Sequence, residues 1–239
     1  MSIKPLLIVK TGSTVPQVAE RRGDFEDWMA EGTGLGRSQI EVVSVYSGEA
    51  LPEPGRHPAV LVTGSAAMVT DHEPWSDRTA AWLAEASRTG ATILGVCYGH
   101  QLLALGRGGR IGVNPRGREI GTVDIELTEA AAEDPLLRVL PSPLRVQATH
   151  REAVLDLPSD AVLLGGNAMD PHQIFRLGDR AWGVQFHPEF DADIIRGYIA
   201  ARREAIAGEG LDPDALQHAT LDGDHGRRLL RRFAELAVP

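Results

Sequence analysis

The chain has 239 residues, of which 43% are hydrophobic and 24% are charged. This length and hydrophobic content are typical of one domain with a buried core, or of one domain with an appendage. Its 24 Lys and Arg side chains against 33 Asp and Glu give a formal net charge of −9, which argues against nucleic acid and anionic membranes as partners.

The first apolar stretch, residues 6–9, is too short for the core of a signal peptide or for a membrane span. The single cysteine of the sequence, Cys97, excludes an internal disulfide and any metal site built from several cysteines. A free thiol fits a reducing compartment. We therefore expect a cytoplasmic protein that does not act at a membrane.

The first hundred residues alternate between short β-rich runs and helical patterns. Strands are predicted at residues 5–10, 40–46, 59–63 and 91–96, and helices at 15–30, 76–89 and 98–105. This alternation predicts crossover connections and a parallel sheet that is covered on both faces. The glycines at positions 32, 34 and 36 lack the spacing of a dinucleotide-binding fingerprint, so we assign them to a loop.

The strand predicted at 91–96 runs into Gly95-Val96-Cys97-Tyr98-Gly99-His100-Gln101, a pattern typical of a nucleophile elbow. Small residues on both sides of Cys97 allow the sharp turn from strand to helix that an elbow needs. The thiol is then expected beside the N-terminus of the next helix, where backbone N–H groups favour a thiolate and an oxyanion. A lone cysteine is otherwise most often a small buried hydrophobic residue. The flanking glycines decide against that alternative.

Five more strands are predicted downstream, at residues 122–127, 144–148, 161–164, 173–177 and 181–186. The last of them leads into Phe186-His187-Pro188-Glu189. A spacing of two in extended chain turns the His187 and Glu189 side chains to the same side, and the proline ends the strand. A nucleophilic cysteine needs a base, and the base needs an orienting group. The sequence thus predicts a Cys97, His187 and Glu189 triad, with a simple strand cap as the alternative role for His187.

The segment from Asp191 onward is charged and helical in pattern. We expect a catalytic domain at residues 1–190 and a helical extension at 191–239 that packs on the same domain. One interpretation of the arginine pairs at 227–228 and 231–232 is a docking surface for a partner. The simpler one is a solvated helix face that packs Leu229, Leu230 and Phe233 onto the body.

The other histidines carry weaker signals. They are scattered through the sequence without the spacing of metal ligands, so we expect no metal and no cofactor. His100 belongs to the turn after Cys97, and there a structural hydrogen bond is the favoured role.

The two motifs at 95–101 and 186–189 together resemble the class I glutamine amidotransferase family, in particular its stand-alone members similar to the glutaminase domain of GMP synthase. The likeness extends over most of the chain. Supporting stretches lie at residues 11–13, 24–28, 64–65, 71–75, 114–121 and 149–152. One departure is Thr63-Gly64-Ser65, where many relatives have Gly-Gly-Pro.

The resemblance implies a flavodoxin-like α/β fold, a three-layer arrangement with an open, mostly parallel sheet flanked by helices. It implies Cys97 as nucleophile, His187 as general base and then acid, and Glu189 as the residue that orients His187. It also implies an oxyanion hole formed by the backbone N–H groups of Gly64 and Tyr98. The positions that match substrate contacts in the family are Gln101, Thr149, His150 and Arg151.

The expected reaction is hydrolysis of the side-chain amide of glutamine, with ammonia supplied to an acceptor. The sequence has no phosphate-binding loop, so activation of the acceptor would require a separate synthetase subunit. Two alternatives stay open. One is a hydrolase of γ-glutamyl peptides or amines, and the other is a non-catalytic sensor or scaffold, which a complete triad argues against.

Overall fold

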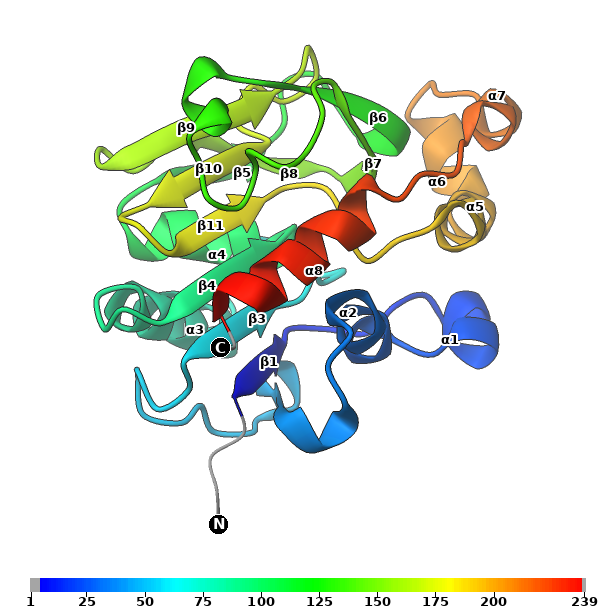
Figure 1. Cartoon of the computed structure of the whole chain (residues 1–239). Helices are drawn as coiled ribbons and strands as arrows, with labels where there is room; N and C mark the ends of the chain where they lie inside the picture. Colours follow the sequence, from blue (N-terminus) through cyan, green and yellow to red (C-terminus); the bar gives the residue numbers. More distant parts are fainter. Residues whose placement is uncertain (1–4, 238–239) are drawn as a thin grey trace.

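The computed structural model describes residues 5–237 as a sheet with helices on both faces (Figure 1). The strands are β1 (Leu6–Lys10), β2 (Ile40–Ser44), β3 (Ala59–Val62), β4 (Thr92–Val96), β5 (Arg110–Val113), β6 (Glu119–Leu127), β7 (Leu144–His150), β8 (Glu152–Asp156), β9 (Ala161–Gly166), β10 (Ile174–Leu177) and β11 (Ala181–Val184). The helices are α1 (Pro16–Arg22), α2 (Phe25–Thr33), α3 (Pro74–Ala86), α4 (Tyr98–Gly106), α5 (Ala192–Ala201), α6 (Arg203–Gly208), α7 (Pro213–Ala219) and α8 (His225–Ala237).

The main sheet has nine strands in the order β2-β1-β3-β4-β11-β10-β9-β6-β7. The strands from β2 to β11 pair in parallel, and those from β11 to β7 pair antiparallel. The predicted class, an open α/β sheet flanked by helices, is confirmed, with the antiparallel strands gathered in one half. The parallel half positions the candidate site, because the carboxyl ends of parallel strands meet at one edge.

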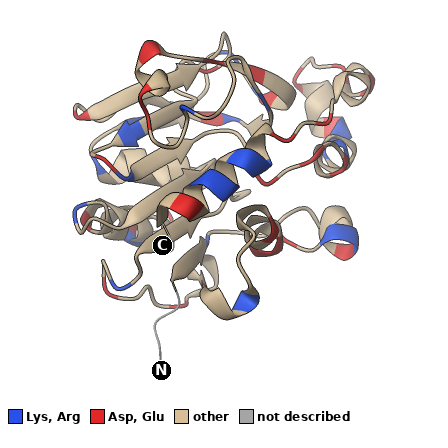
Figure 2. Cartoon of the chain, in the orientation of Figure 1, with Lys and Arg blue, Asp and Glu red and all other residues tan. Residues whose placement is uncertain are grey.

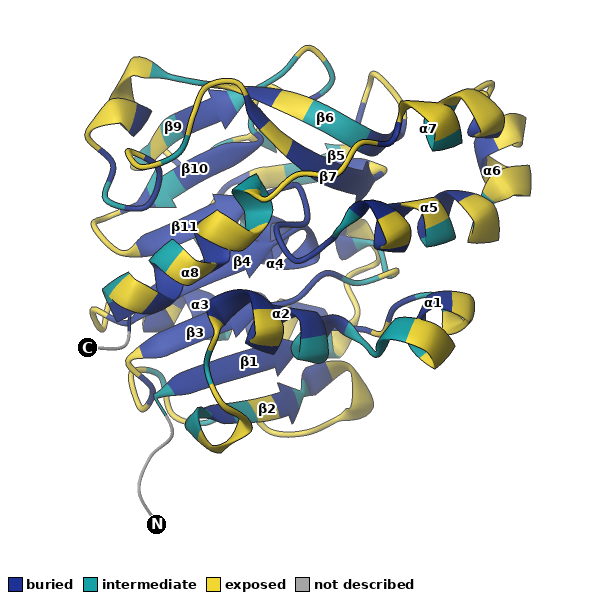
Figure 3. Cartoon of the chain, turned by 45° about the vertical axis from the view of Figure 1, so that its right-hand side comes forward, coloured by how far each residue is buried: buried dark blue, intermediate teal, exposed yellow. Residues whose placement is uncertain are grey.

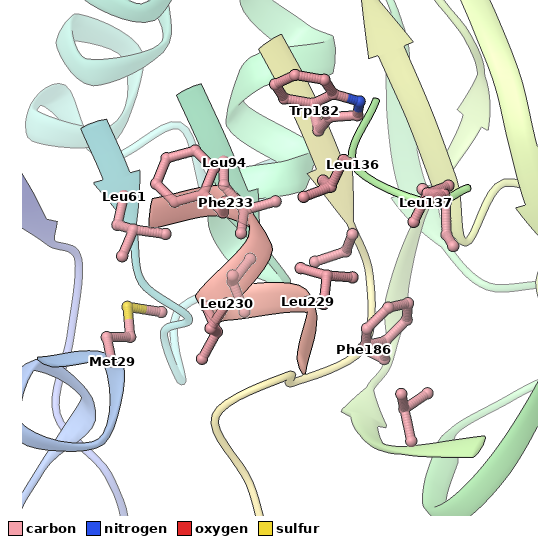
Figure 4. Packing of buried hydrophobic residues seen from close by; sticks show 14 of the residues in the cluster. Met29, Leu61, Leu94, Leu136, Leu137, Trp182, Phe186, Leu229, Leu230 and Phe233 are labelled. Atoms are coloured by element: carbon pink, nitrogen blue, oxygen red, sulfur yellow. The ribbon is translucent and has the colours of Figure 1, made fainter. Parts of the chain in front are cut away.

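Two hydrophobic cores cover the two faces of the sheet. Helices α2 and α8 pack on one face, where Met29 and Leu230 meet Leu61 and Leu94 of the sheet (Figure 4). Helices α3 and α4 cover the other face, through residues such as Leu83 and Leu102. Buried strands therefore lie between two helical layers, as Figure 3 shows. This double burial explains why the central strands read as continuous apolar runs rather than alternating ones.

The helix predicted at residues 15–30 is in fact two helices, and that prediction was wrong. Gly23 adopts a φ of 79° and ends α1. Asp24 then begins α2 with a capping box, in which its side chain and that of Asp27 satisfy the first backbone N–H groups. The break turns α1 away from the sheet and over its carboxyl edge, beside α5 (Figure 1).

Two short strands, β5 and β8, were not predicted. They form a separate antiparallel ribbon.

The described residues contain no helix that is long and apolar enough to span a membrane.

The C-terminal helix α8 lies lengthwise against the sheet. Leu229, Leu230 and Phe233 are fully buried, which confirms that this face packs onto the body. The arginines of α8 follow its outer face (Figure 2).

A third hydrophobic cluster lies at the carboxyl edge of the parallel strands. It joins α1, α2 and α5 through residues such as Val18, Phe25, Phe190 and Tyr198. This cluster forms one wall of the candidate site.

Candidate active site

Cys97 lies between β4 and α4, at the carboxyl end of its strand. Its φ of 51° and ψ of −97° fall where non-glycine residues are rarely found. The flanking glycines are required by close packing: a Cβ on Gly95 would lie 2.4 Å from the carbonyl oxygen of Gly99, and one on Gly99 would lie 2.7 Å from the Cβ of Val62. The backbone N–H of Cys97 donates to the carbonyl of Val184 at 2.8 Å. The turn is thus fixed by its neighbours on both sides.

His187 follows β11 and is held by both its backbone and its ring. Its N–H donates to the carbonyl of Gln147 at 2.8 Å. The imidazole stacks on the ring of Phe190 with centroids 4.1 Å apart, and Phe25 lies parallel to it at 6.0 Å. The carboxylate of Glu189 accepts from Nδ1 at 2.8 Å. These contacts leave the ring little freedom to rotate.

The charge state of His187 is set by its anionic neighbours. Burial by itself lowers the pKa of His187, but the charge of Glu189, the charge of Cys97 and hydrogen bonds to both side chains raise the pKa to about 10. The ring is therefore an imidazolium at neutral pH. An imidazolium that is hydrogen-bonded to Cys97 stabilises the thiolate, which is the reactive form of a cysteine.

The backbone N–H groups of Gly64 and Tyr98 both lie beside the Cys97 turn. In residues 5–237 neither N–H has a hydrogen-bond acceptor. A Cβ on Gly64 would lie 2.7 Å from Cε1 of His187, so the β3 end abuts the imidazole. The Tyr98 side chain points elsewhere, since its hydroxyl bonds Ser76 on α3 at 2.7 Å.

The loop after β3 is braced by Thr11. The Thr11 hydroxyl lies 2.9 Å from the carbonyl oxygens of both Thr63 and Gly64. Its backbone N–H also donates to the Thr63 hydroxyl at 3.0 Å. Because the Thr63 carbonyl and the Gly64 N–H belong to one planar peptide, fixing the carbonyl fixes the direction of that N–H.

Cys97 and His187 line a pocket of about 340 Å³. All four residues that the resemblance assigns to substrate contact line the same pocket. Gln101 is engaged with the protein, because its amide donates to the Glu152 carbonyl at 2.9 Å and to Gln185 at 3.1 Å. Thr149 has a buried hydroxyl with no partner among the described residues, and its carbonyl oxygen is 3.9 Å from the Cys97 Sγ.

His150 and Arg151 differ in their surroundings. His150 is buried, with Nε2 2.8 Å from a carboxylate oxygen of Glu119 and Nδ1 3.0 Å from the carbonyl of Glu152. Both ring nitrogens are occupied, so His150 is not free to act as a base on Cys97. Arg151 is half-exposed at the rim, with Nε 3.6 Å from Glu209.

The pocket also contains charged residues that the sequence analysis did not assign. Arg118, which directly precedes β6, and Arg202 of the α5–α6 junction both line it. Glu209, which follows α6, accepts two hydrogen bonds from Arg118 at 2.6 and 2.9 Å. Arg118 falls within the stretch at 114–121 that resembles the family. Arg202 and Glu209 lie in the charged segment from Asp191 onward and belong to no recognisable motif.

The fold and the geometry define a class of protein, an α/β protein with a cysteine, histidine and glutamate at the carboxyl edge of its parallel strands. Residues 52–199 match the family described as "Glutamine amidotransferase class-I". This match covers more than half of the chain, which therefore belongs to the class I glutamine amidotransferase family.

Individual relatives have different names. The chain is 37% identical over 142 residues to a GMP synthase (glutamine-hydrolyzing) of Aeropyrum pernix, covering 59% of this chain and 25% of that protein. It is 32% identical over 105 residues to gamma-glutamyl peptidase 4 of Arabidopsis thaliana, covering 43% and 42%. The chain thus matches less than half the length of either relative. A glutamine amidotransferase crystal structure from Thermotoga maritima superimposes with a TM-score of 0.77 at 22% identity, covering 98% of both chains, which shows the shared fold.

Proposed function

We propose that the chain hydrolyses the γ-amide bond of glutamine or of a related γ-glutamyl compound through a Cys97 thioester. The observation that carries this proposal is the convergence of Cys97 with the hydrogen-bonded pair His187 and Glu189 at a pocket, from segments about ninety residues apart. In this proposal the strained turn at Cys97 acts as a nucleophile elbow. A free thiol at this position also supports a location in the reducing cytoplasm.

The proposed reaction begins with the Cys97 thiolate and the His187 imidazolium. The thiolate attacks the γ-carbonyl carbon, and the carbonyl oxygen becomes an oxyanion that the N–H groups of Gly64 and Tyr98 bind. His187 gives its proton to the departing amine, the C–N bond breaks, and a thioester remains. Neutral His187 then takes a proton from water, and the hydroxide attacks the thioester. Glutamate leaves, and the thiolate and imidazolium are restored. Glu189 stabilises the charged ring throughout.

The oxyanion donors are the largest electrostatic contribution in this scheme. Removal of one such donor typically costs about 3 to 4 kcal/mol in acyl-transfer enzymes. Because no proline follows Gly64 to stiffen the turn, the sequence by itself predicts an oxyanion loop that is poorly arranged until a partner docks. The Thr11 contacts with Thr63 and Gly64 argue against that prediction, because they brace the loop within the chain itself.

The names of the relatives suggest two possible destinations for the released nitrogen: transfer to an acceptor, or release as free amine. Likeness to a GMP synthase supports a glutaminase that supplies ammonia to a separate synthetase subunit, whereas likeness to a γ-glutamyl peptidase supports a hydrolase that acts alone. The braced loop and the arginines of the pocket favour the second candidate. The complete triad argues against a non-catalytic scaffold.

A turnover assay separates the candidates. We expect the purified chain to release amine from a γ-glutamyl compound at an ordinary enzymatic rate, of the order of 10 per second, without a partner. A chain that hydrolyses only glutamine, slowly, and accelerates when a synthetase with its activated acceptor is added would instead identify the ammonia-supplying subunit. Absence of turnover in both settings would contradict the catalytic proposal.

A further inference from the structure

Three guanidinium groups surround one side of the pocket that contains Cys97. They belong to Arg118, Arg151 and Arg202, which come from three separate segments of the chain and all line this pocket. The carboxylate of Glu209 lies in contact with two of them. Glu209 is already engaged, because Arg118 binds both of its oxygens and Arg151 lies 3.6 Å from one of them. The three guanidinium groups and Glu209 together carry a net positive charge, in a chain whose net charge is −9.

Arg202 is the cation without a counter-ion. Its guanidinium lies over the ring of Tyr198, 5.5 Å from the centroid, and in the described residues it has no hydrogen bond or ion pair. Burial lowers the pKa of Arg202, and the nearby positive charge of Arg118 lowers it further, while Tyr198, Cys97 and Glu209 offset only part of this effect. Partly buried charges are ordinarily paired. An unpaired guanidinium that faces a pocket is thus prepared for an anionic ligand.

We propose that Arg202, supported by Arg118 and Arg151, binds a carboxylate of the substrate and so selects γ-glutamyl compounds that carry one at that position. The planar fork of arginine matches a carboxylate with two parallel hydrogen bonds. The unpartnered hydroxyl of Thr149 lines the same pocket and supplies a further donor. This inference rests on the proposed function, since it assigns a subsite to the same reaction.

The carboxylate has two sources in a γ-glutamyl peptide. One is the α-carboxylate of the glutamyl unit, and the other is the carboxylate of the departing amino acid. Three ligands distinguish them: γ-glutamylglycine, its glycinamide analogue without the terminal carboxylate, and its α-amide analogue without the α-carboxylate.

The test compares Arg202→Met with Arg203→Met. Methionine keeps much of the length of the arginine but not its charge. Arg203 is the adjacent residue, is exposed, and pairs with Asp214 away from the pocket, so it controls for loss of one positive charge. Each change is made in the active chain for kcat/KM and in a Cys97→Ser chain for Kd by calorimetry.

With γ-glutamylglycine we expect Arg202→Met to weaken binding and kcat/KM roughly 10- to 100-fold, the size of lost charge-assisted hydrogen bonds. Arg203→Met should change them less than about twofold. If Arg202 binds the glycine carboxylate, Arg202→Met should weaken binding of every ligand except the glycinamide analogue. If Arg202 binds the α-carboxylate, Arg202→Met should weaken binding of every ligand except the α-amide analogue.

Equal losses with all three ligands would indicate a structural role and overturn the inference, as would no difference between the two variants. Binding that depends on Arg202 without any turnover would leave the subsite standing and contradict the catalytic proposal. Turnover that Arg202→Met leaves unchanged would support the catalytic proposal and contradict the subsite.

Discussion

Replacement of Glu189 by glutamine tests the electrostatics of the candidate triad directly. The amide keeps the shape of the side chain but removes the charge that lies 2.8 Å from Nδ1 of His187. The rise in the pKa of His187 from 6.5 to about 10 corresponds to on the order of 5 kcal/mol in favour of the imidazolium. The charge of Glu189 is the first of the contributions that raise it. We therefore expect Glu189→Gln to lower this pKa by roughly one to two pH units.

The sign of the pH effect follows from which form is active. In the proposed mechanism the imidazolium is the proton donor for the leaving amine, so activity should persist below the pKa of His187 and be lost as pH rises through it. In the unaltered chain, kcat/KM should stay level from about pH 7 to 9 and fall near pH 10. In Glu189→Gln the fall should begin at a lower pH, and kcat should decrease more than KM changes.

Two measurements check this prediction. The first is kcat/KM between pH 6 and 11, with circular dichroism at each pH to exclude unfolding. The second is the NMR titration of the His187 ring, which does not require turnover. Glu235→Gln is the matched control, because Glu235 is exposed on α8 and pairs with Arg232, away from His187. A His187 titration near pH 6.5 in the unaltered chain, or one that Glu189→Gln leaves unmoved, would refute the reasoning.

The remaining predictions concern the nucleophile and the oxyanion loop. A diazoketone analogue of glutamine should add its acyl chain to the peptide that contains Cys97, seen by mass spectrometry, and Cys97→Ala should abolish both labelling and turnover; retained turnover would exclude the thioester. Gly64→Ala should lower kcat at least a hundredfold, because its Cβ would lie 2.7 Å from Cε1 of the packed His187 ring. Gly36→Ala, where the nearest atom is 3.7 Å away, should leave kcat unchanged. Thr11→Val should lower kcat roughly tenfold with little change in KM; a change confined to KM would mean that Thr11 does not act through the oxyanion loop.

The parts of the site that are local in sequence were predictable. The glycines around Cys97 encode the sharp turn, and close packing around Gly95 and Gly99 shows why only glycine fits there. The spacing of His187 and Glu189 likewise places both side chains in contact. In each case a few neighbouring residues determine the geometry, so a short pattern carries the information.

The parts built by long-range contacts were not predictable. Arg118 and Glu209 are 91 residues apart, and they meet because α5 and α7, the helices before and after α6, pack against β6. Arg202 has no motif around it, and its significance lies in the absence of a partner for its guanidinium within residues 5–237. The ribbon of β5 and β8 was missed for a similar reason, since each strand is short and its partner is distant in sequence. The helix break at Gly23 was a local signal, but helical periodicity on both sides concealed it.

The negative net charge of the chain disfavours anionic ligands, whereas the arginines of the pocket favour them. Which effect dominates depends on how close the ligand comes to each set of charges. At physiological ionic strength, exposed charges are largely screened beyond about 8 Å, so the acidic outer surface chiefly disfavours large polyanions that would approach over many residues. A small anion that enters the pocket meets Arg118 and Arg202 at close range, where the surrounding protein reduces screening. An acidic protein can therefore reject nucleic acid and still select a small carboxylate. Raising the salt concentration should accordingly affect the Arg202-dependent discrimination between the glycine and glycinamide ligands much less than it would affect a surface ion pair.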